Sequence, residues 1–368
     1  MKVGILTFHK ALNYGAVLQA FALNKKIGEM GHESTLIDYC DIGMIEQYKV
    51  SIFKKNISFK RTISNIITYI PRKTRYNKFV LFSTKFLNTT SLLITDENVL
   101  RKYNFNFDAY ICGSDQVWNP EIYGDTVNPI YFLDFVSNQK AIKISYAASF
   151  GRDEIETKFY PEMKKYLENI KFLSVRENDG VNIIKKISGQ DSQQVVDPVF
   201  LIKPEEWSAM DASIVIKKPY ILIYLMESNL DLLKIAHLLS KDLSIEVINI
   251  TPSILKYYCV DKNIMTAGPS DFVSLIKNAS YVITNSFHAT AFSIIFNRPF
   301  LTLKHSKWNS RMQSLLNTFG ISTQMITKLS TDDPVILEKM FHYDTNKINI
   351  LIEREIRKSI DFLKKALK

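Results

Sequence analysis

Short apolar segments alternate with amphipathic segments along most of this 368-residue chain, and this alternation limits the folds that it can adopt. The apolar segments have the length of buried strands, about four to eight residues, and the segments between them repeat apolar residues at helical spacing. The expected strands cover residues 2–8, 34–39, 108–112, 142–147, 172–175, 194–196, 220–225, 245–250, 281–284 and 300–304. Alternation of this kind predicts mostly parallel sheets with helices on both faces.

The helices expected between these strands cover residues 13–31, 153–169, 178–187, 230–239, 270–278, 286–296 and 310–319. The chain is too long for one ordinary core, and Pro198 and Pro204 interrupt the regular pattern near its middle. We therefore predict two doubly wound, Rossmann-like α/β domains that face each other across a cleft. We expect the first over residues 1–200, the second over 201–345, and an amphipathic helix over 346–368 that packs across them.

The excess positive charge of the chain lies in one insert. Residues 47–95 contain ten Lys and Arg residues and no Asp or Glu, while the rest of the chain contains 37 basic and 37 acidic residues. Isoleucines and aromatic residues are interleaved with this charge, which suits a surface that faces anionic lipid or a lipid-linked phosphate. A solvated helix face would explain the pattern equally well. No recognition motif accompanies the charge, so we do not expect a nucleic-acid partner.

The sequence carries no sign of export or membrane insertion. Its first eight residues lack the apolar core and cleavage site of a secretory signal, and no segment approaches the roughly 18 uncharged apolar residues of a membrane span. Cys40, Cys112 and Cys259 are far apart and have neither disulfide nor metal-ligand spacing. We therefore expect a cytoplasmic protein without a bound metal, peripheral to the inner face of the membrane if the basic insert binds lipid.

Polar residues gather in the loops that follow the expected strands, which is where ligands bind in open parallel sheets. His288 lies in the first turn of the helix that follows the strand at 281–284, and the amino termini of helices attract anions. A histidine at such a position is more often a cap or a core residue. The polar residues of the other loops favour a role for His288 in acid-base chemistry.

Two of these loops carry groups that suit a sugar or an anion. Asp115 could accept hydrogen bonds from hydroxyls and Trp118 could lie under a sugar ring, although a well-bonded turn would use the same residues. Arg176 ends a strand, so its guanidinium could fork onto a carboxylate or a phosphate. A local salt bridge from Arg176 to Glu177 or Asp179 is equally compatible with the sequence.

Two further loops carry weaker candidates. Asn13 and Tyr14 precede Gly15 at the start of a helix, a pattern that is more typical of a structural turn. Lys304 and Arg311 could add positive potential on the second domain, although each taken alone is more typical of a surface residue.

Seven short motifs occur in an order that resembles the polysaccharide pyruvyl transferase family. They comprise residues 13–20, 113–119, 131–135, 146–151, 174–177, 196–198 and 284–288. The resemblance implies a fold similar to GT-B glycosyltransferases and transfer of pyruvate from phosphoenolpyruvate to a sugar of a cell-surface polysaccharide or its lipid-linked precursor. The product would be a cyclic ketal, with release of phosphate. Phosphoenolpyruvate would be a co-substrate, so no cofactor is expected.

The resemblance also implies roles for residues that bind the donor. The functional histidine of the family falls on His288, expected here as the acid or base, and a donor-binding arginine falls on Arg176. Some members carry an arginine at the position of Ser286, so phosphate binding here must rely on other groups. We expect Ser286, Arg311 and Lys304 to contribute, together with the amides of the helix.

The saccharide acceptor is expected on the first domain and the donor on the second. Asn13, Tyr14, Gln116 and Trp118 are the predicted acceptor-binding residues, and Asp115 would orient or deprotonate an acceptor hydroxyl. A GT-B glycosyltransferase that uses a nucleotide sugar and a silent glycan-binding protein are the alternatives. The acceptor sugar, its attachment to a lipid and the oligomeric state stay open at this point.

Overall fold

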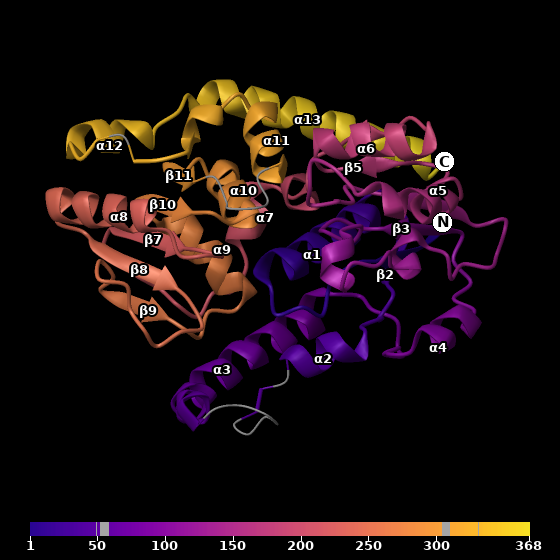
Figure 1. Cartoon of the computed structure of the whole chain (residues 1–368), viewed down its shortest axis with the longest axis horizontal. Coiled ribbons are helices and arrows are strands. Elements are labelled where there is room, and N and C mark those ends of the chain that lie inside the picture. The colour runs from indigo at the N-terminus through magenta and orange to yellow at the C-terminus, as the bar shows by residue number, and fades with distance from the viewer. Residues whose placement is uncertain (49, 52–58, 304–309, 330) are drawn as a thin grey trace.

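Two parallel β-sheets form the centres of two α/β halves that lie beside each other (Figure 1). The computed structural model describes residues 1–48, 50–51, 59–303, 310–329 and 331–368, of which residues 47 and 59–64 are described by their backbone alone. Figure 1 places the first half around the amino terminus and the second half around the strands that follow residue 219.

The first sheet has the strand order β2-β1-β3-β4, and all its neighbouring strands are parallel. Its strands are β1 (Lys2–Leu6), β2 (Glu33–Leu36), β3 (Ala109–Cys112) and β4 (Ile142–Ser145). Two short strands, β5 (Ser174–Val175) and β6 (Gln193–Gln194), pair with each other. A parallel bridge between Ala148 and Val175 joins this pair to the sheet.

The second sheet has the order β12-β11-β10-β7-β8-β9 and is also parallel throughout. Its strands are β7 (Tyr220–Tyr224), β8 (Glu246–Ile250), β9 (Lys262–Ile264), β10 (Tyr281–Thr284), β11 (Phe300–Leu303) and β12 (Met325–Ile326). The predicted doubly wound fold is therefore confirmed. The sequence did not predict β9 and β12, which are short and lie at the two edges of this sheet.

Most of the predicted helices are present. They are α1 (Tyr14–Glu29), α5 (Tyr160–Leu167), α6 (Asn178–Ser188), α8 (Leu230–Leu243), α9 (Pro269–Asn278), α10 (Phe287–Ile295), α11 (Ser310–Thr318) and α13 (Thr345–Ala366). Shorter helices are α2 (Ile42–Tyr48), α4 (Glu97–Lys102), α7 (Pro204–Ser208) and α12 (Pro334–Met340). Helix α5 is shorter than predicted, because a separate 3₁₀ turn, η3 (Thr157–Phe159), precedes it.

Helix α10 lies in the interior of the molecule, and its sequence explains why. Its nine residues are apolar or small around most of the helix and all of them are buried. A helix that is apolar on all sides is stable only when it is covered on all sides. The side chain of Ser286 caps the helix by accepting a hydrogen bond from the amide of Ala289. The first turn of α10 is thereby fixed in the centre of the molecule.

The described part of the basic insert contains one long helix, α3 (Phe59–Phe86), at the lower edge of the molecule in Figure 1. One side of α3 is part of the core. Phe82 packs edge-on against Phe21 of α1, and Lys78 Nζ lies 2.7 Å from Asp271 Oδ2 of α9. The opposite side carries exposed isoleucines, of which Ile70 is the most exposed at 74%. Helix α3 therefore contacts both halves while one face stays open.

Helix α13 extends along the upper edge of both halves in Figure 1. On the first half, Ser359 Oγ accepts a hydrogen bond from the amide of Val196, and Phe362 packs near Tyr146. On the second half, the residue before the helix, Asp344, caps it, and the nearby Tyr343 packs against Phe300. None of the helices in the described parts of the chain has both the length and the apolar character that crossing a bilayer would require.

Candidate active site

A small cavity lies between the two halves at the carboxyl ends of the strands, where the polar loops were expected to meet. Its volume is about 110 Å³. Polar residues of both halves line it, namely Asn13, Asp115, Gln116, Asn285, Ser286, His288 and Arg311. In a parallel sheet this edge is the usual place for a ligand.

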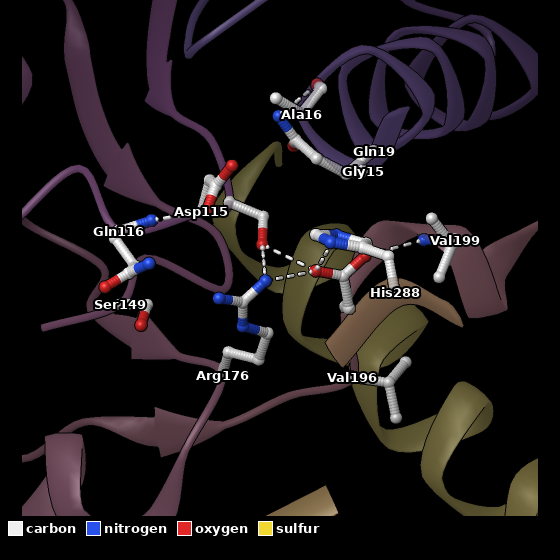
Figure 2. Close-up of polar contacts among 12 residues, drawn as sticks. Gly15, Ala16, Gln19, Asp115, Gln116, Ser149, Arg176, Val196, Val199 and His288 are labelled. Atoms are coloured by element: carbon white, nitrogen blue, oxygen red, sulfur yellow. Dashed lines mark hydrogen bonds and ion pairs between the residues drawn. The ribbon is translucent and has the colours of Figure 1, made fainter. Parts of the chain in front are cut away.

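Arg176 and His288 lie near each other in the site (Figure 2), and a buried carboxylate, Asp197, connects them. Its Oδ2 accepts hydrogen bonds from Arg176 Nη1 at 2.7 Å and from Ser114 Oγ at 2.9 Å. The same oxygen lies 3.5 Å from His288 Nε2. Burial alone would raise the pKa of Asp197, but the charges and hydrogen bonds of His288 and Arg176 outweigh it and hold this pKa below its usual range. Asp197 is therefore an anion that holds a guanidinium and an imidazole in place.

Arg176 is buried beside Asp197, with its guanidinium 4.2 Å from the centre of the Phe287 ring. Within the described residues its Nε and Nη2 atoms have no hydrogen-bond acceptor. Glu177 Oε2 lies 4.0 Å from Nε, so the strong partner of Arg176 is Asp197 and not the local acid. Arg176 does not line the 110 Å³ cavity, and in this arrangement it supports the cavity from behind. The predicted binding of the donor by Arg176 stays a prediction.

Arg311 is the guanidinium that does line the cavity. With the side-chain amide of Gln116 in the orientation that satisfies its neighbours, the Gln116 oxygen accepts from Arg311 Nη1 at 3.1 Å and Nη2 at 3.2 Å. Burial and the like charge of Arg176 lower the pKa of Arg311 to about 10. Arg311 is therefore charged at neutral pH, and it is a cation that an added anion would stabilise.

His288 lies between the two halves in close contact with helix α1. A Cβ atom added to Gly15 would lie 1.9 Å from His288 Nδ1, so no other residue fits at position 15 without displacing the imidazole. Asn13 fixes the start of α1, because its Oδ1 accepts from the amides of Gly15 at 2.9 Å and Ala16 at 3.3 Å. The amino termini of α1 and α10 thus meet at one imidazole, and both contribute positive potential there.

Asp115 has an unusual backbone conformation at the edge of the cavity. Its φ angle is +87°, in the left-handed region that a residue with a side chain seldom adopts. The conformation is held by the hydrogen bond from the Ser149 amide to the Asp115 carbonyl and by that from the Gln116 amide to Asp115 Oδ1. Strained residues of this kind are frequent at functional sites.

A second, larger cavity of about 670 Å³ adjoins the first and is built from the first half alone. The two cavities share Asn13, Asp115 and Gln116 in their walls. Aromatic and polar side chains line the larger one, namely Phe8, Asp41, Tyr48, Tyr123, Thr126, Asn128 and Tyr131. We call the larger space the outer chamber and the smaller one the inner cavity.

Two of the predicted acceptor-binding residues lie elsewhere, so these predictions are wrong. Trp118 is 1% exposed, with its Nε1 donating to the carbonyl of Tyr131 at 2.9 Å and its ring stacked on Phe132. Tyr14 is 2% exposed, and its ring stacks on Phe272 across the contact between the halves. The polar atom of each side chain donates a hydrogen bond to a backbone carbonyl, and both rings pack in the core.

The remaining predicted residues have different positions. Asn13 and Gln116 face both cavities, although the side-chain oxygen of Asn13 is engaged in the helix cap. Ser286 lines the inner cavity and also serves as a cap. Lys304 lies outside the residues that the structure describes.

Two acids of this site were missed as functional residues by the sequence analysis. Asp197 lies in the motif 196–198 at a break in regular structure, but the sequence assigns it no role in the site. Glu177 lies in the motif 174–177, and the sequence suggests it only as a salt-bridge partner of Arg176. Its Oε1 accepts from Ser149 Oγ at 2.8 Å and from the Phe150 amide at 2.9 Å. Burial raises the pKa of Glu177, although the charge of Arg176 acts against it.

The residues of this site do not include an arrangement typical of a metal centre. Across the described chain, no three His, Cys, Asp or Glu side chains lie together as metal ligands do. The cysteines Cys40, Cys112 and Cys259 are all buried and free, and none of them lines the inner cavity.

Comparison with known proteins gives one family and a set of similar folds. A family model described as polysaccharide pyruvyl transferase matches residues 13–307. No curated protein matches the sequence.

Solved structures share the fold at low sequence identity. The UDP-GlcNAc 2-epimerase from Neisseria meningitidis bound to UDP-GlcNAc is 13% identical, with a TM-score of 0.51 over 99% of this chain and 100% of that one. The Methanocaldococcus jannaschii UDP-GlcNAc 2-epimerase in complex with UDP-GlcNAc and UDP is 14% identical, with a TM-score of 0.51 over 94% of each chain. The glycotransferase of kitacinnamycin is 9% identical, with a TM-score of 0.51 over 99% and 97%. The likeness concerns the fold, and it confirms the predicted GT-B-like arrangement.

Proposed function

Because this chain belongs to the polysaccharide pyruvyl transferase family, we propose that it transfers pyruvate from phosphoenolpyruvate to a sugar of a cell-surface polysaccharide or of its lipid-linked precursor. The product is a cyclic ketal and phosphate is released. One observation carries the proposal most strongly: the guanidinium of Arg311 and an imidazole flanked by two helix amino termini line one small cavity. Such a cavity suits a compact ligand with more than one negative charge.

The reaction needs one proton delivered to carbon and two hydroxyl groups of the acceptor. An acid protonates the methylene carbon of phosphoenolpyruvate, and positive charge develops at C2. One sugar hydroxyl attacks C2, the bond from C2 to the phosphate oxygen breaks, and a second hydroxyl closes the ketal. Of the two hydroxyl protons, one replaces the proton given to the methylene carbon and the other leaves with phosphate. The atoms balance without an oxidant or a reductant.

His288 is the proposed acid and base in this scheme. It borders the inner cavity, and Asp197 Oδ2 lies 3.5 Å from its Nε2. A carboxylate at that distance helps to orient the ring, and a positioned imidazole beside the donor can transfer a proton to or from it. Asp197 is a positioning residue here, because it contacts His288 and Arg176 and does not line the inner cavity.

Donor and acceptor binding are assigned to different walls of the inner cavity. Arg311 and the amides at the start of α10 bind the carboxylate and phosphate of the donor, and they take the place of the arginine that some family members have at position 286. Asp115 faces both cavities and is the proposed group that orients or deprotonates the acceptor hydroxyl. Fixed charges of this kind act strongly in a closed site, because little reorganisation is needed during the reaction.

A phosphorus NMR assay tests the proposal. The protein is incubated with phosphoenolpyruvate and a panel of simple glycosides, and separately with nucleotide sugars and the same glycosides. We expect inorganic phosphate in the first mixture and an acceptor whose mass has increased by one pyruvate less one water. Release of a nucleoside diphosphate in the second mixture would instead favour a GT-B glycosyltransferase. Saccharide binding without turnover of any donor would favour a silent binding protein.

The open face of α3 is the proposed contact with an anionic membrane, where a lipid-linked acceptor would be found. Ile66, Ile67 and Ile70 are exposed on it, Lys73 lies one turn further along, and no acid occurs in residues 47–95. Apolar side chains beside positive charge favour binding to an interface with anionic lipid.

Sedimentation with lipid vesicles tests this contact. We expect the protein to bind vesicles that contain phosphatidylglycerol, less so at high salt, and Ile70→Asp to weaken the binding. Val335→Asp on α12 is the matched control, because Val335 is also exposed and lies on the opposite edge of the molecule in Figure 1. Equal binding of phosphatidylcholine vesicles, or equal loss in both variants, would contradict a membrane role for α3.

A further inference from the structure

The outer chamber has the size and the walls of a saccharide site. Its volume of about 670 Å³ falls within the range of roughly 300–1,000 Å³ that is common for ligand pockets. The phenol rings of Tyr48 and Tyr123 provide flat apolar surfaces, while Asn128 and Thr126 add polar groups. Tyr131 is 3% exposed and stacks on Tyr123, so it supports this wall. Aromatic rings beside amides and carboxylates are the groups that sugars use for stacking and hydrogen bonding.

The outer chamber opens onto the inner cavity at the residues that carry the proposed chemistry. Asn13, Asp115 and Gln116 form the shared wall, so a ring in the outer chamber can present hydroxyls to the donor. The chamber belongs to the first half of the molecule, whereas His288 and Arg311 come from the second half. The two substrates would therefore approach the reacting atoms from different halves.

The two spaces differ in charge. Among the described residues that line the outer chamber there is no Lys, Arg or His, and the charged groups are the carboxylates of Asp41 and Asp115. The Asp115 charge also reaches Tyr48, whose pKa is raised by burial and then by this carboxylate, while the charge of Arg75 acts against it. The inner cavity shares Asp115 and also contains Arg311 and His288. A carboxylate or sulfate on a sugar ring would meet repulsion from these two acids, and none of the described lining residues is a cation that would offset it.

We infer that the outer chamber binds an uncharged sugar and excludes sugars that carry a negative charge. The inference rests on the proposed function only for the role of this sugar as the acceptor. The preference for a neutral ring depends only on the residues that line the outer chamber.

Equilibrium binding tests the inference without any donor. Methyl glycosides of glucose, galactose and mannose are each compared with the corresponding uronic acid, which differs by a carboxylate at C6. Binding is followed by saturation-transfer NMR and titration. We expect at least one neutral glycoside to bind more tightly than its uronate, with a difference that becomes smaller as salt is added.

Asp41→Asn removes one of the two charges with little change in shape. Because Asp41 is exposed, we expect the preference for the neutral sugar to fall by only about two- to fivefold. Asp242→Asn, an equal change of charge on α8 of the second half, is the control and should leave the preference unchanged.

The outcomes separate this inference from the proposed function. A uronate that binds as well as its neutral partner, the absence of binding by every neutral glycoside, or equal effects of the two substitutions would overturn the inference. In another outcome, the neutral preference is observed and is reduced by Asp41→Asn while phosphoenolpyruvate is never consumed. That result would support the inference about the outer chamber and contradict the proposed pyruvyl transfer.

Discussion

Gly15 and His288 come from opposite halves of the molecule and lie so close that a Cβ atom on Gly15 would be 1.9 Å from the imidazole Nδ1. The contact explains why a glycine follows Asn13 and Tyr14 at the start of α1: the backbone of this turn is one wall of the histidine site. It also means that the position of His288 depends on how the two halves are packed together.

Gly15→Ala should displace His288 and greatly reduce turnover. Overpacking a closed site costs about 1–3 kcal/mol, so the thermal midpoint should fall moderately while the protein still folds. Gly28→Ala is the matched control on the same helix, because a Cβ at Gly28 meets nothing within 4 Å. We expect Gly28→Ala to leave turnover unchanged and to be neutral or slightly stabilising. Equal turnover in both variants, measured as phosphate release, would show that the contact with Gly15 does not position the histidine.

His288→Gln should reduce turnover by about 10² to 10⁴, the usual contribution of a positioned acid or base. Glutamine is uncharged and similar in length, so circular dichroism and the thermal midpoint should change little. The measurement is the single-turnover rate of phosphate release at saturating phosphoenolpyruvate. A rate within a factor of about three of wild type would remove His288 from the proton transfer.

Asp197→Asn should destabilise the protein, because it leaves the buried guanidinium of Arg176 without its anion. Breaking one partner of a buried pair costs about 3–5 kcal/mol, and urea unfolding at pH 7 measures it. If Asp197 also orients His288, the pH profile of turnover should differ from that of wild type, because the imidazole loses its neighbouring carboxylate. A purely structural role would lower stability and leave that profile in place.

The same carboxylate predicts how stability depends on pH. Folding lowers the pKa of Asp197, so the ionised form stabilises the protein above the unfolded-state pKa of about 3.9, and this contribution is lost as the pH falls toward the folded-state pKa. The free energy of unfolding should therefore decline more steeply below about pH 4 in wild type than in Asp197→Asn. Parallel curves for the two proteins would contradict an ionised Asp197 in the fold.

Glu177→Gln provides an isosteric comparison at a second buried acid beside Arg176. Folding raises the pKa of Glu177, chiefly through burial, so its ionisation opposes folding above the unfolded-state pKa of about 4.3. We expect Glu177→Gln to leave stability at pH 7 unchanged or higher, and its difference from wild type to grow as the pH rises above about 4. A loss as large as that of Asp197→Asn would mean that both acids compensate Arg176 equally.

The sequence predicted the two parallel sheets because their central strands are buried on both faces and therefore appear as continuous apolar runs. The edge strands β9 and β12 were missed, since they are only three and two residues long and carry little of that pattern. The long helix α3 was not placed either, because one of its faces is apolar and packed while the opposite face mixes charge with exposed isoleucines. Its apolar residues therefore do not mark a single stripe.

The sequence predicted part of the candidate site. The errors of that prediction have one physical origin. Trp118 and Tyr14 stand among polar neighbours in the sequence, but the direction of a side chain depends on the backbone of the turn. Near Trp118 that backbone includes Asp115 with a φ angle of +87°, which the sequence did not reveal. Asp197 was missed because its role depends on Arg176 and His288, which are distant in the sequence and meet it only after both halves have folded. Contacts between residues that are distant in the sequence leave no local pattern in the sequence.

Arg311 gives the last prediction, which concerns binding of the donor at high pH. Its pKa is lowered to about 10 by burial and by the charge of Arg176, so the guanidinium loses its proton within a range of pH that the protein can be tested in. If Arg311 binds phosphoenolpyruvate, the KM for this donor should rise as the pH increases from 8 toward about 10, whereas an ordinary arginine would stay charged. Arg311→Gln should have a raised KM already at pH 8 and should lose the pH dependence, while Arg298→Gln, a change of charge away from the inner cavity, should keep both as in wild type. A KM that is flat with pH in wild type, or a pH dependence retained in Arg311→Gln, would assign donor binding to another group.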